Sequence, residues 1–406
     1  MVKLTRRTAL AGMAAAPVVA MPAIVRAQGS KSVKIGLVSD LSGPYRDVGG
    51  IGNKVAAEMA IADFGGTVLG RPVEVLQGDC LDKPDTASGL ARRWIDTDHI
   101  DALADGAASS SGLAVQQISR EKKVPYLVTG PASSDFTGKE CSPYCTHWAY
   151  DTYALANVTG GAMTKSGGST WYFITADYAF GYALERDTIA AVEKAGGKVL
   201  GKVRAPLATP DFSSYLVQAR ASKAKVIGLA NAGTDTQNCI KQAAEFGITQ
   251  GGQKLATLLI QITDINSLGQ KICVGLTFTN SFYWAMTPKT IAWTKRYMAK
   301  MHSPPTLLHA SNYAATLHWL KAVKAVGSTD GTKVMAQMKA TPVNDFYNDN
   351  IKIREDGRVM HTMYLWEVKP VSESKFKYDF LKHVATVPGE EAFRPMSQDH
   401  CSFIKA

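Results

Sequence analysis

The chain has 406 residues, with 45 Lys and Arg against 35 Asp and Glu. Its 46% hydrophobic and 20% charged residues are typical of folded globular proteins and exclude a wholly disordered or fibrous chain. The one long apolar stretch lies at the N-terminus, which excludes a multi-span membrane protein, and the length predicts two or three domains.

Residues 1–27 have the layout of a cleaved export signal. They carry Lys3 and three arginines, no acidic residue, and an alanine-rich apolar run that ends in the small-x-small pattern Val25-Arg26-Ala27. The pair Arg6-Arg7 resembles the twin-arginine type, with the general secretory route left open. An uncleaved membrane anchor is the alternative, which two prolines in the run disfavour.

Removal of this segment lowers the net charge from +10 to +6, since four positive charges lie within it. The remaining Lys and Arg are scattered and form no long basic run. A nucleic-acid partner would need them clustered on one face. We therefore expect an exported protein that binds no nucleic acid.

Strands and helices alternate along the first part of the mature chain, with short links rich in Gly and Pro. The predicted strands span residues 33–38, 72–76, 101–104 and 125–128. The predicted helices span residues 53–64, 87–95 and 113–122. This alternation predicts a mostly parallel sheet with helices on both faces.

The pattern restarts near residue 170. Further strands are predicted at 170–174, 199–203, 225–229, 255–260 and 273–278, and helices at 184–194, 213–222, 235–246, 290–301 and 312–326. A closing strand pair, 350–353 and 363–368, flanks a turn at 355–357. The sequence therefore predicts an α/β protein with two halves of similar plan, the first completed by returning chain.

The chain contains six cysteines, and an even number in an exported protein predicts disulfides. Cys141 and Cys145 are close enough in sequence to pair, and Cys239 with Cys273 is a second plausible pair, which leaves Cys80 for Cys401. Cys141, Cys145 and His147 are alternatively half of a metal site. Because no second Cys/His pair of zinc-like spacing follows, we predict disulfides and no metal.

Small and hydroxyl residues follow three of the first predicted strands, at residues 39–45, 106–112 and 129–135. Ligands of open α/β sheets bind at the carboxyl ends of strands, where helix N-termini offer free N–H groups to anions. Each serine is alternatively an ordinary helix cap. Two serine-rich loops at one edge of a sheet nevertheless favour a site for an anion such as a carboxylate.

Catalytic motifs are scarce. The nearest is Gly50-Ile51-Gly52-Asn53, with Val55 where a dinucleotide-binding loop has its third glycine and Asp79 in the place of the ribose-binding acid. The glycines lie well beyond the strand instead of in its turn, and no nucleophile, base and orienting group occur as a recognisable set. An exported NAD-type oxidoreductase stays the alternative to a protein that is not an enzyme.

Several motifs together resemble the periplasmic receptors of ABC importers, in particular the branched-chain amino-acid (Leu/Ile/Val-binding) family. They are Leu41-Ser42-Gly43-Pro44, Gly106 to Ser111, Pro131 to Ser134, Asp177 to Gly181, Pro210 to Leu216, and Ile353 to Gly357. Phe180 stands where the family usually has Tyr. The resemblance covers nearly all of the mature chain.

The resemblance implies a two-lobed type I fold, each lobe a mostly parallel sheet flanked by helices. Lobe I is expected over residues 28–149 and 282–356, and lobe II over 150–281 and 357–406. Three hinge crossings are expected near Trp148-Ala149-Tyr150, near Thr279-Asn280-Ser281 and near Gly357.

It also implies a ligand site between the lobes. A ligand carboxylate is expected at Ser109, Ser110, Ala132, Ser133 and Ser134. The remaining site residues are expected to be Tyr45 from lobe I, Tyr178, Phe180, Asn231, Asp235 and Gln261 from lobe II, and Tyr283 beside Trp284 at the second crossing.

The resemblance implies a solute receptor, without cofactor or catalysis, that acts as a monomer in the periplasm with ABC permease subunits as partners. The ligand is expected to be a small hydrophobic carboxylate, either an aromatic acid or a branched-chain amino acid. An amino acid needs a buried acid beside its ammonium group, for which Asp235 and Asp264 are candidates. A ligand-sensing receptor on the same fold is a further alternative; it would be expected to continue into a membrane helix, which this chain does not.

Overall fold

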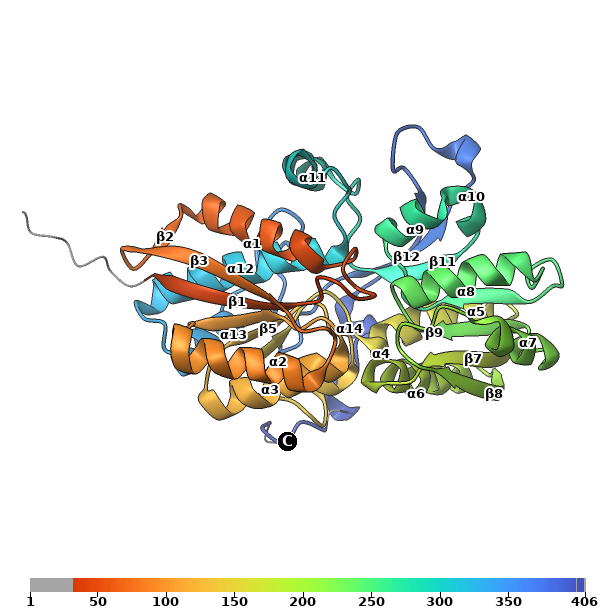
Figure 1. Cartoon of the computed structure of the whole chain (residues 1–406), viewed down its shortest axis with the longest axis horizontal. Coiled ribbons are helices and arrows are strands. Elements are labelled where there is room, and N and C mark those ends of the chain that lie inside the picture. Colours follow the sequence, from red (N-terminus) through yellow and green to blue (C-terminus); the bar gives the residue numbers. More distant parts are fainter. Residues whose placement is uncertain (1–31, 399, 405–406) are drawn as a thin grey trace, which may run out of the picture.

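The structure is a computed structural model that describes residues 32–398 and 400–404. Two groups of sheet and helices lie side by side along the long axis (Figure 1). The expected export signal, residues 1–27, lies outside the described residues. Among the residues that are described, no helix combines the length and apolarity that a membrane crossing requires.

The elements follow the expected alternation. The strands are β1 (Val33–Ser39), β2 (Thr67–Val68), β3 (Arg71–Asp79), β4 (Ala102–Asp105), β5 (Tyr126–Val128), β6 (Cys145–His147), β7 (Thr170–Ala176), β8 (Lys198–Ala205), β9 (Val226–Ala230), β10 (Lys254–Thr257), β11 (Thr277–Asn280), β12 (Met363–Val368) and β13 (Leu381–Val387). The helices are α1 (Gly50–Phe64), α2 (Pro84–Arg93), α3 (Ser109–Lys122), α4 (Thr152–Leu155), α5 (Gly161–Lys165), α6 (Ala179–Lys194), α7 (Ser213–Ala221), α8 (Thr234–Glu245), α9 (Ile262–Leu268), α10 (Gln270–Cys273), α11 (Pro288–Met301), α12 (Leu307–Val326), α13 (Gly331–Ala340) and α14 (Gly389–Ala392).

The first sheet has the order β2-β3-β1-β4-β5-β6 and is parallel except for β2. Its strands are apolar on both faces: Ile35 and Leu37 pack with α1 and α12, while Val38 and Leu103 pack with α2 and α3. Burial on both faces is what a parallel sheet between two helix layers requires. We call this sheet, with α1, α2, α3, α12 and α13, the first lobe.

The second sheet has the order β10-β9-β7-β8 and is entirely parallel. Trp171 and Phe173 pack toward α6, and Ile174 and Leu229 pack toward α7 and α8. We call this sheet with α6, α7 and α8 the second lobe. The expected α/β fold, with mostly parallel sheets flanked by helices, is therefore confirmed.

The closing strand pair was predicted with the wrong partner. Strand β12 pairs antiparallel with β11 and β13 in a third, three-stranded sheet. Ile351 and Ile353 instead make isolated bridges with Val343 and Val359. Residues 363–368 form a strand as expected, but nothing local indicated that its partners lie at 277–280 and 381–387. Cys273, expected to open the strand at 273–278, is instead the last residue of α10, and β11 begins at Thr277.

The cysteine pairs suggested by proximity are also wrong. Cys141 forms a disulfide with Cys401, 260 positions away, and Cys80, Cys145, Cys239 and Cys273 are buried free thiols. Cys145 opens β6 and packs in the core of the first lobe as a free thiol. The disulfide instead ties the C-terminal segment to the first lobe.

Candidate functional site

A cavity lies between the two lobes, where the carboxyl ends of both parallel sheets meet. The first lobe contributes Asp40, Tyr45, Val48, Gly49, Gly50, Asp105, Ala107, Ala108, Ser109, Gly130, Ala132 and Leu308. The second contributes Tyr178, Phe180, Ala232 and Gly233, and Tyr150, Leu259, Gln261 and Asp264 complete the lining. This is the position at which open α/β sheets bind ligands.

The N-terminus of α3 faces this cavity. Ala108 is the residue before the helix, and no side chain caps the helix start. The first-turn N–H groups of a helix have no partner within it, and they favour an anion. The serine-rich run forms this end because β4 stops at Asp105 and Gly106 turns the chain with a φ of 112°.

Ser109 joins the helix to the loop after β5. Its Oγ accepts hydrogen bonds from the backbone N–H groups of Ala132 at 3.2 Å and Ser133 at 3.1 Å. The oxygen is thereby used as an acceptor, and the hydroxyl hydrogen is left to donate. Ser109 and Ala132 both line the cavity, so a donor of this kind is available to a carboxylate there.

Three aspartates line the cavity, while its lining contains no Lys, Arg or His. Asp105 accepts hydrogen bonds from Ser39 and Asn53, and burial still raises its pKa to about 6. Asp264 accepts from Gln237 at 2.7 Å, and burial raises its pKa to about 6 as well. Both carboxyl groups would be stabilised in their charged form by a cation in the cavity.

Gln261 brings a free donor to the same cavity. It precedes α9 and is 3% exposed. Its Oε1 accepts from Asn280, whereas its Nε2 has no hydrogen-bond partner among the described residues. A buried amide donor without a partner is costly, so an acceptor atom on a ligand would stabilise it.

Six of the predicted site residues line the cavity, namely Tyr45, Ser109, Ala132, Tyr178, Phe180 and Gln261. Asp264, proposed as an ammonium partner, lines it too.

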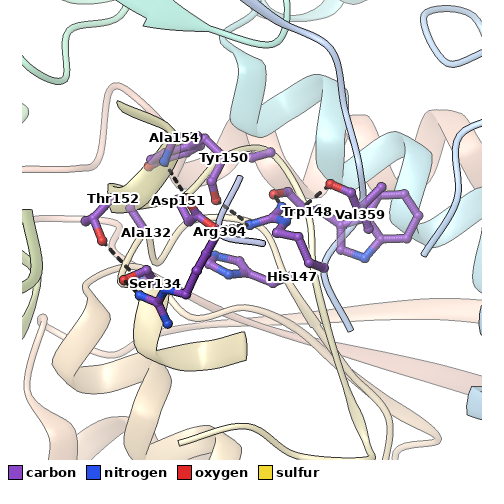
Figure 2. Close-up of polar contacts among 12 residues, drawn as sticks. Ala132, Ser134, His147, Trp148, Tyr150, Asp151, Thr152, Ala154, Val359 and Arg394 are labelled. Atoms are coloured by element: carbon purple, nitrogen blue, oxygen red, sulfur yellow. Dashed lines mark hydrogen bonds and ion pairs between the residues drawn. The ribbon is translucent and has the colours of Figure 1, made fainter. Parts of the chain in front are cut away.

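The other predicted carboxylate-binding serines lie elsewhere. Ser110 is half-buried on α3 and does not line the cavity. Ser133 caps the short helix Ser134–Thr137 by accepting from the N–H of Asp135. Ser134 donates to Asp187 and accepts from Arg394 in a polar network outside the cavity. Figure 2 shows Ser134 beside Thr152 and Arg394.

The remaining predicted residues also have partners of their own. Asn231 binds Thr236 and Cys239. Asp235 accepts from the N–H of Ala208, and burial raises its pKa to about 7. The Tyr283 hydroxyl donates to the Tyr378 carbonyl, and its ring packs on Trp366. None of these three side chains lines the cavity.

Several lining residues were not predicted. Asp40 directly follows β1, and Asp105 is the last residue of β4. Their positions at strand ends could therefore have indicated that they line the site. Ala232 and Gly233 follow β9 in the same way. Leu308 had no such signal, because it comes from α12, far along the chain.

Three segments meet between the lobes. Arg358, fully buried, donates hydrogen bonds to the carbonyl groups of Trp148 and Tyr150, and Ser281 donates to the carbonyl of Ala149 at 2.7 Å. Figure 2 shows Trp148, Tyr150, Asp151 and Val359 gathered around this network. The three successive carbonyls of residues 148–150 are thus held by two other parts of the chain.

Within residues 32–398 and 400–404, no three His, Cys, Asp or Glu side chains gather in a way that could hold a metal ion. The glycines of the suspected dinucleotide motif open α1, and Gly49 and Gly50 line the cavity. Asp79, the expected ribose-binding acid, instead binds Ser42 and the N–H of Leu41.

The family model described as a periplasmic binding protein matches residues 32–375. A curated relative, the Leu/Ile/Val-binding protein homolog 6 of Brucella melitensis biotype 1, is 27% identical over 259 residues. That match covers 63% of this chain, and the chain spans 65% of the relative's length.

Solved structures are similar over most of the chain. A periplasmic binding protein from Burkholderia mallei is 49% identical with a TM-score of 0.91, covering 92% of this chain and 100% of that one. A branched chain amino acid ABC transporter periplasmic ligand-binding protein from Burkholderia xenovorans LB400 is 36% identical with a TM-score of 0.81, covering 91% and 99%. A solute binding protein from R. palustris in complex with benzoate shares the fold at 19% identity and a TM-score of 0.81, covering 92% and 100%. The family and these neighbours are solute-binding proteins, not enzymes.

Proposed function

The chain belongs to the periplasmic binding protein family, and from that premise we propose that it is an exported receptor that binds a small hydrophobic carboxylate between its lobes and delivers it to an ABC importer. The observation that carries this proposal is the cavity at the carboxyl ends of both sheets, lined by the start of α3 and by aromatic side chains. An apolar cavity with a few convergent polar groups is the usual form of a small-molecule site.

The ligand carboxylate is proposed to lie against the start of α3. The Ser109 hydroxyl and the first-turn N–H groups supply donors, and the positive end of the helix dipole favours the charge. No Lys or Arg is needed for this mode of binding. The carboxylate would be held by neutral donors that burial strengthens.

A branched-chain or other small apolar amino acid is the ligand that we favour. Asp40, Asp105 and Asp264 line a cavity whose lining has no basic side chain, which disfavours an anion without a positive charge of its own. An α-ammonium group would neutralise part of this negative charge. Two of the similar proteins, at 36% and 27% identity, carry branched-chain amino-acid names, in support of this choice.

An aromatic acid is the second candidate. Tyr45, Tyr150, Tyr178 and Phe180 line the cavity and could pack on a planar ring. Such a ligand would need the nearby carboxyl groups to be protonated, and the raised pKa of Asp105 and Asp264 is in the direction that this requires.

We also propose the lobe boundaries and partners that the family implies. Residues 28–149 with 282–356 and residues 150–281 with 357–406 would move as two bodies about the segments near 148–150, 279–281 and 357. Residues 1–27 would direct export to the periplasm, where a monomer would deliver its ligand to ABC permease subunits.

The test is a thermal-shift panel on the mature chain, residues 28–406, after removal of any bound ligand. The panel contains leucine, isoleucine, valine, benzoate, hydroxybenzoates and hydroxycinnamates. A ligand at 100 times its Kd stabilises the protein by about 2.7 kcal/mol, which raises the melting temperature by a few degrees. A shift with the amino acids alone supports the favoured ligand, and a shift with the aromatic acids alone supports the second. No shift with any compound would contradict the proposed ligand class.

A further inference from the structure

Two tyrosines from opposite walls of the cavity contact each other. Tyr45 lies in the turn after β1 in the first lobe, and Tyr178 precedes α6 in the second. Their hydroxyl oxygens are 2.5 Å apart, and both side chains line the cavity. The hydrogen bond therefore joins the lobes at the edge of the proposed ligand site.

Gly233 lies beside this pair and allows the lobes to approach. A Cβ atom built on it would lie 2.4 Å from the carbonyl oxygen of Pro44 and 2.9 Å from Cδ1 of Tyr45. The next N–H group, of Thr234, donates to the same Pro44 carbonyl at 3.3 Å. Since Pro44 belongs to the first lobe and Gly233 to the second, a side chain at position 233 would hold the two lobes apart.

The closed cavity is narrow. Its volume is about 40 Å³. Tyr45 is 9% exposed, and its backbone N–H is held by Asp40 at 2.7 Å, so the ring has little freedom to move within the first lobe. A ligand group directed at the two tyrosines would have to separate them.

We propose that the Tyr45–Tyr178 pair sets the upper limit on the size of the ligand side chain and that Gly233 is required for the pair to form. This inference rests on the proposed function. Branched aliphatic side chains are accommodated with the pair intact, whereas the phenyl ring of an amino acid forces the two hydroxyl groups apart. The hydroxyl groups stabilise the closed form, and the rings exclude large ligands.

The test compares valine, leucine and phenylalanine by titration calorimetry. The wild-type protein is expected to bind leucine at least about 10-fold more tightly than phenylalanine. Tyr178→Ala removes one ring and should reduce that ratio by about 10-fold. Tyr178→Phe keeps the ring but loses the hydroxyl bond, so every ligand should bind about 2- to 10-fold more weakly with the ratio unchanged.

Tyr182→Phe is the matched control for these variants. Tyr182 lies in the first turn of α6, the helix that Tyr178 precedes. It is 40% exposed, and its hydroxyl donates to Asp177. Its substitution should leave every affinity unchanged. If the wild-type protein binds none of these amino acids, the favoured ligand class fails. If it binds them and Tyr178→Ala leaves the leucine-to-phenylalanine ratio unchanged, the size limit proposed here is wrong.

Gly233→Ala tests the closing contact. Gly233 has φ of 58° and Gly196 has φ of 83°, but a Cβ atom on Gly196 would meet no atom within 4 Å. Both alanine variants place a side chain at a positive φ, and the strain is greater at Gly233, whose ψ of −135° favours glycine. Only Gly233→Ala should weaken ligand binding, by about 10-fold or more. Equal affinities for the two variants would overturn the role of Gly233.

Discussion

Ser109 illustrates how a single position on a helix decides whether a serine can contact a ligand. Ser109 and Ser110 are adjacent at the start of α3, yet only Ser109 lines the cavity. Successive helical residues point about 100° apart around the axis, so neighbours in sequence face different surroundings. A serine-rich run therefore locates a site without identifying the serine that serves it.

Ser109→Ala should weaken ligand binding by about 10-fold, because it removes a hydroxyl donor from the proposed carboxylate site. Ser134→Ala is its control, since Ser134 binds Asp187 and Arg394 outside the cavity. We expect Ser134→Ala to lower the free energy of unfolding by about 1–3 kcal/mol and to leave affinity unchanged. Titration calorimetry and chemical denaturation measure the two effects. If Ser134→Ala weakened ligand binding and Ser109→Ala did not, the carboxylate site would lie at Ser134 instead.

Asp235 should make stability depend on pH. Burial raises its pKa from 3.8 to about 7, and its Oδ1 has no hydrogen-bond partner among the described residues. The folded state therefore favours the protonated form, so this stabilisation is complete below about pH 4 and is lost as the pH rises through 7.

Asp235→Asn should remove this contribution. Its melting temperature is expected to fall less than that of the wild-type protein between pH 5 and pH 8. Asp349→Asn, at an exposed position, is expected to behave as wild type. Identical pH dependence in Asp235→Asn and the wild type would show that the carboxyl group is charged at pH 5.

At the scale of elements, strands and helices are set by local pattern but their partners are not. Strand β12 lies where the sequence predicts a strand, yet it pairs with β11 and β13 instead of with residues 350–353. Cys141 likewise pairs with a cysteine that arrives from the C-terminal segment. Both pairings depend on the path of chain segments that are distant in sequence.

Cys401→Ser should lower the free energy of unfolding by about 2–5 kcal/mol, since the disulfide with Cys141 closes a loop of 260 positions. The double variant Cys141→Ser/Cys401→Ser should lose the same amount, because both changes remove one bond. Chemical denaturation with and without reductant measures this loss. A further loss in the double variant would show that Cys141 stabilises the fold in another way.

At the scale of the whole molecule, the two lobes are connected through a small buried network. Arg358 is fully buried, lies 3.5 Å from the Asp151 carboxylate, and stacks 4.6 Å above the Phe393 ring. Burial lowers its pKa to about 10, so the guanidinium stays charged at neutral pH. The network fixes the chain on either side of Tyr150, whose side chain lines the cavity.

Arg358→Met should lower the free energy of unfolding by about 3–5 kcal/mol, because it leaves the Asp151 charge buried without its partner. Asp151 also caps α4 by accepting from the N–H of Ala154, and Asn can do the same. Adding Asp151→Asn to Arg358→Met should therefore recover part of the loss in chemical denaturation. Additive losses would show that the two side chains stabilise the fold independently.

The class of fold and the edge of the sheets at which the site lies follow from the amino-acid pattern alone. Alternating apolar periods specify strands and helices locally, and parallel strands place their carboxyl ends at one edge. Six of the residues that the family resemblance implies, among them Ser109 and Tyr178, line the cavity. The class of fold and the edge of the sheets needed only local pattern and the geometry common to parallel sheets, whereas the individual site residues came from the family resemblance.

Packing in three dimensions determines which strand-end side chains turn toward the cavity and which distant segments reach it. Asn231 and Tyr283 are turned to partners of their own, while Leu308 arrives from α12. The Cys141–Cys401 bond and the contact of Tyr45 with Tyr178 join residues far apart in sequence. Such contacts depend on the packing of whole elements against one another, because burial of apolar faces sets the path of the chain and local pattern does not record it.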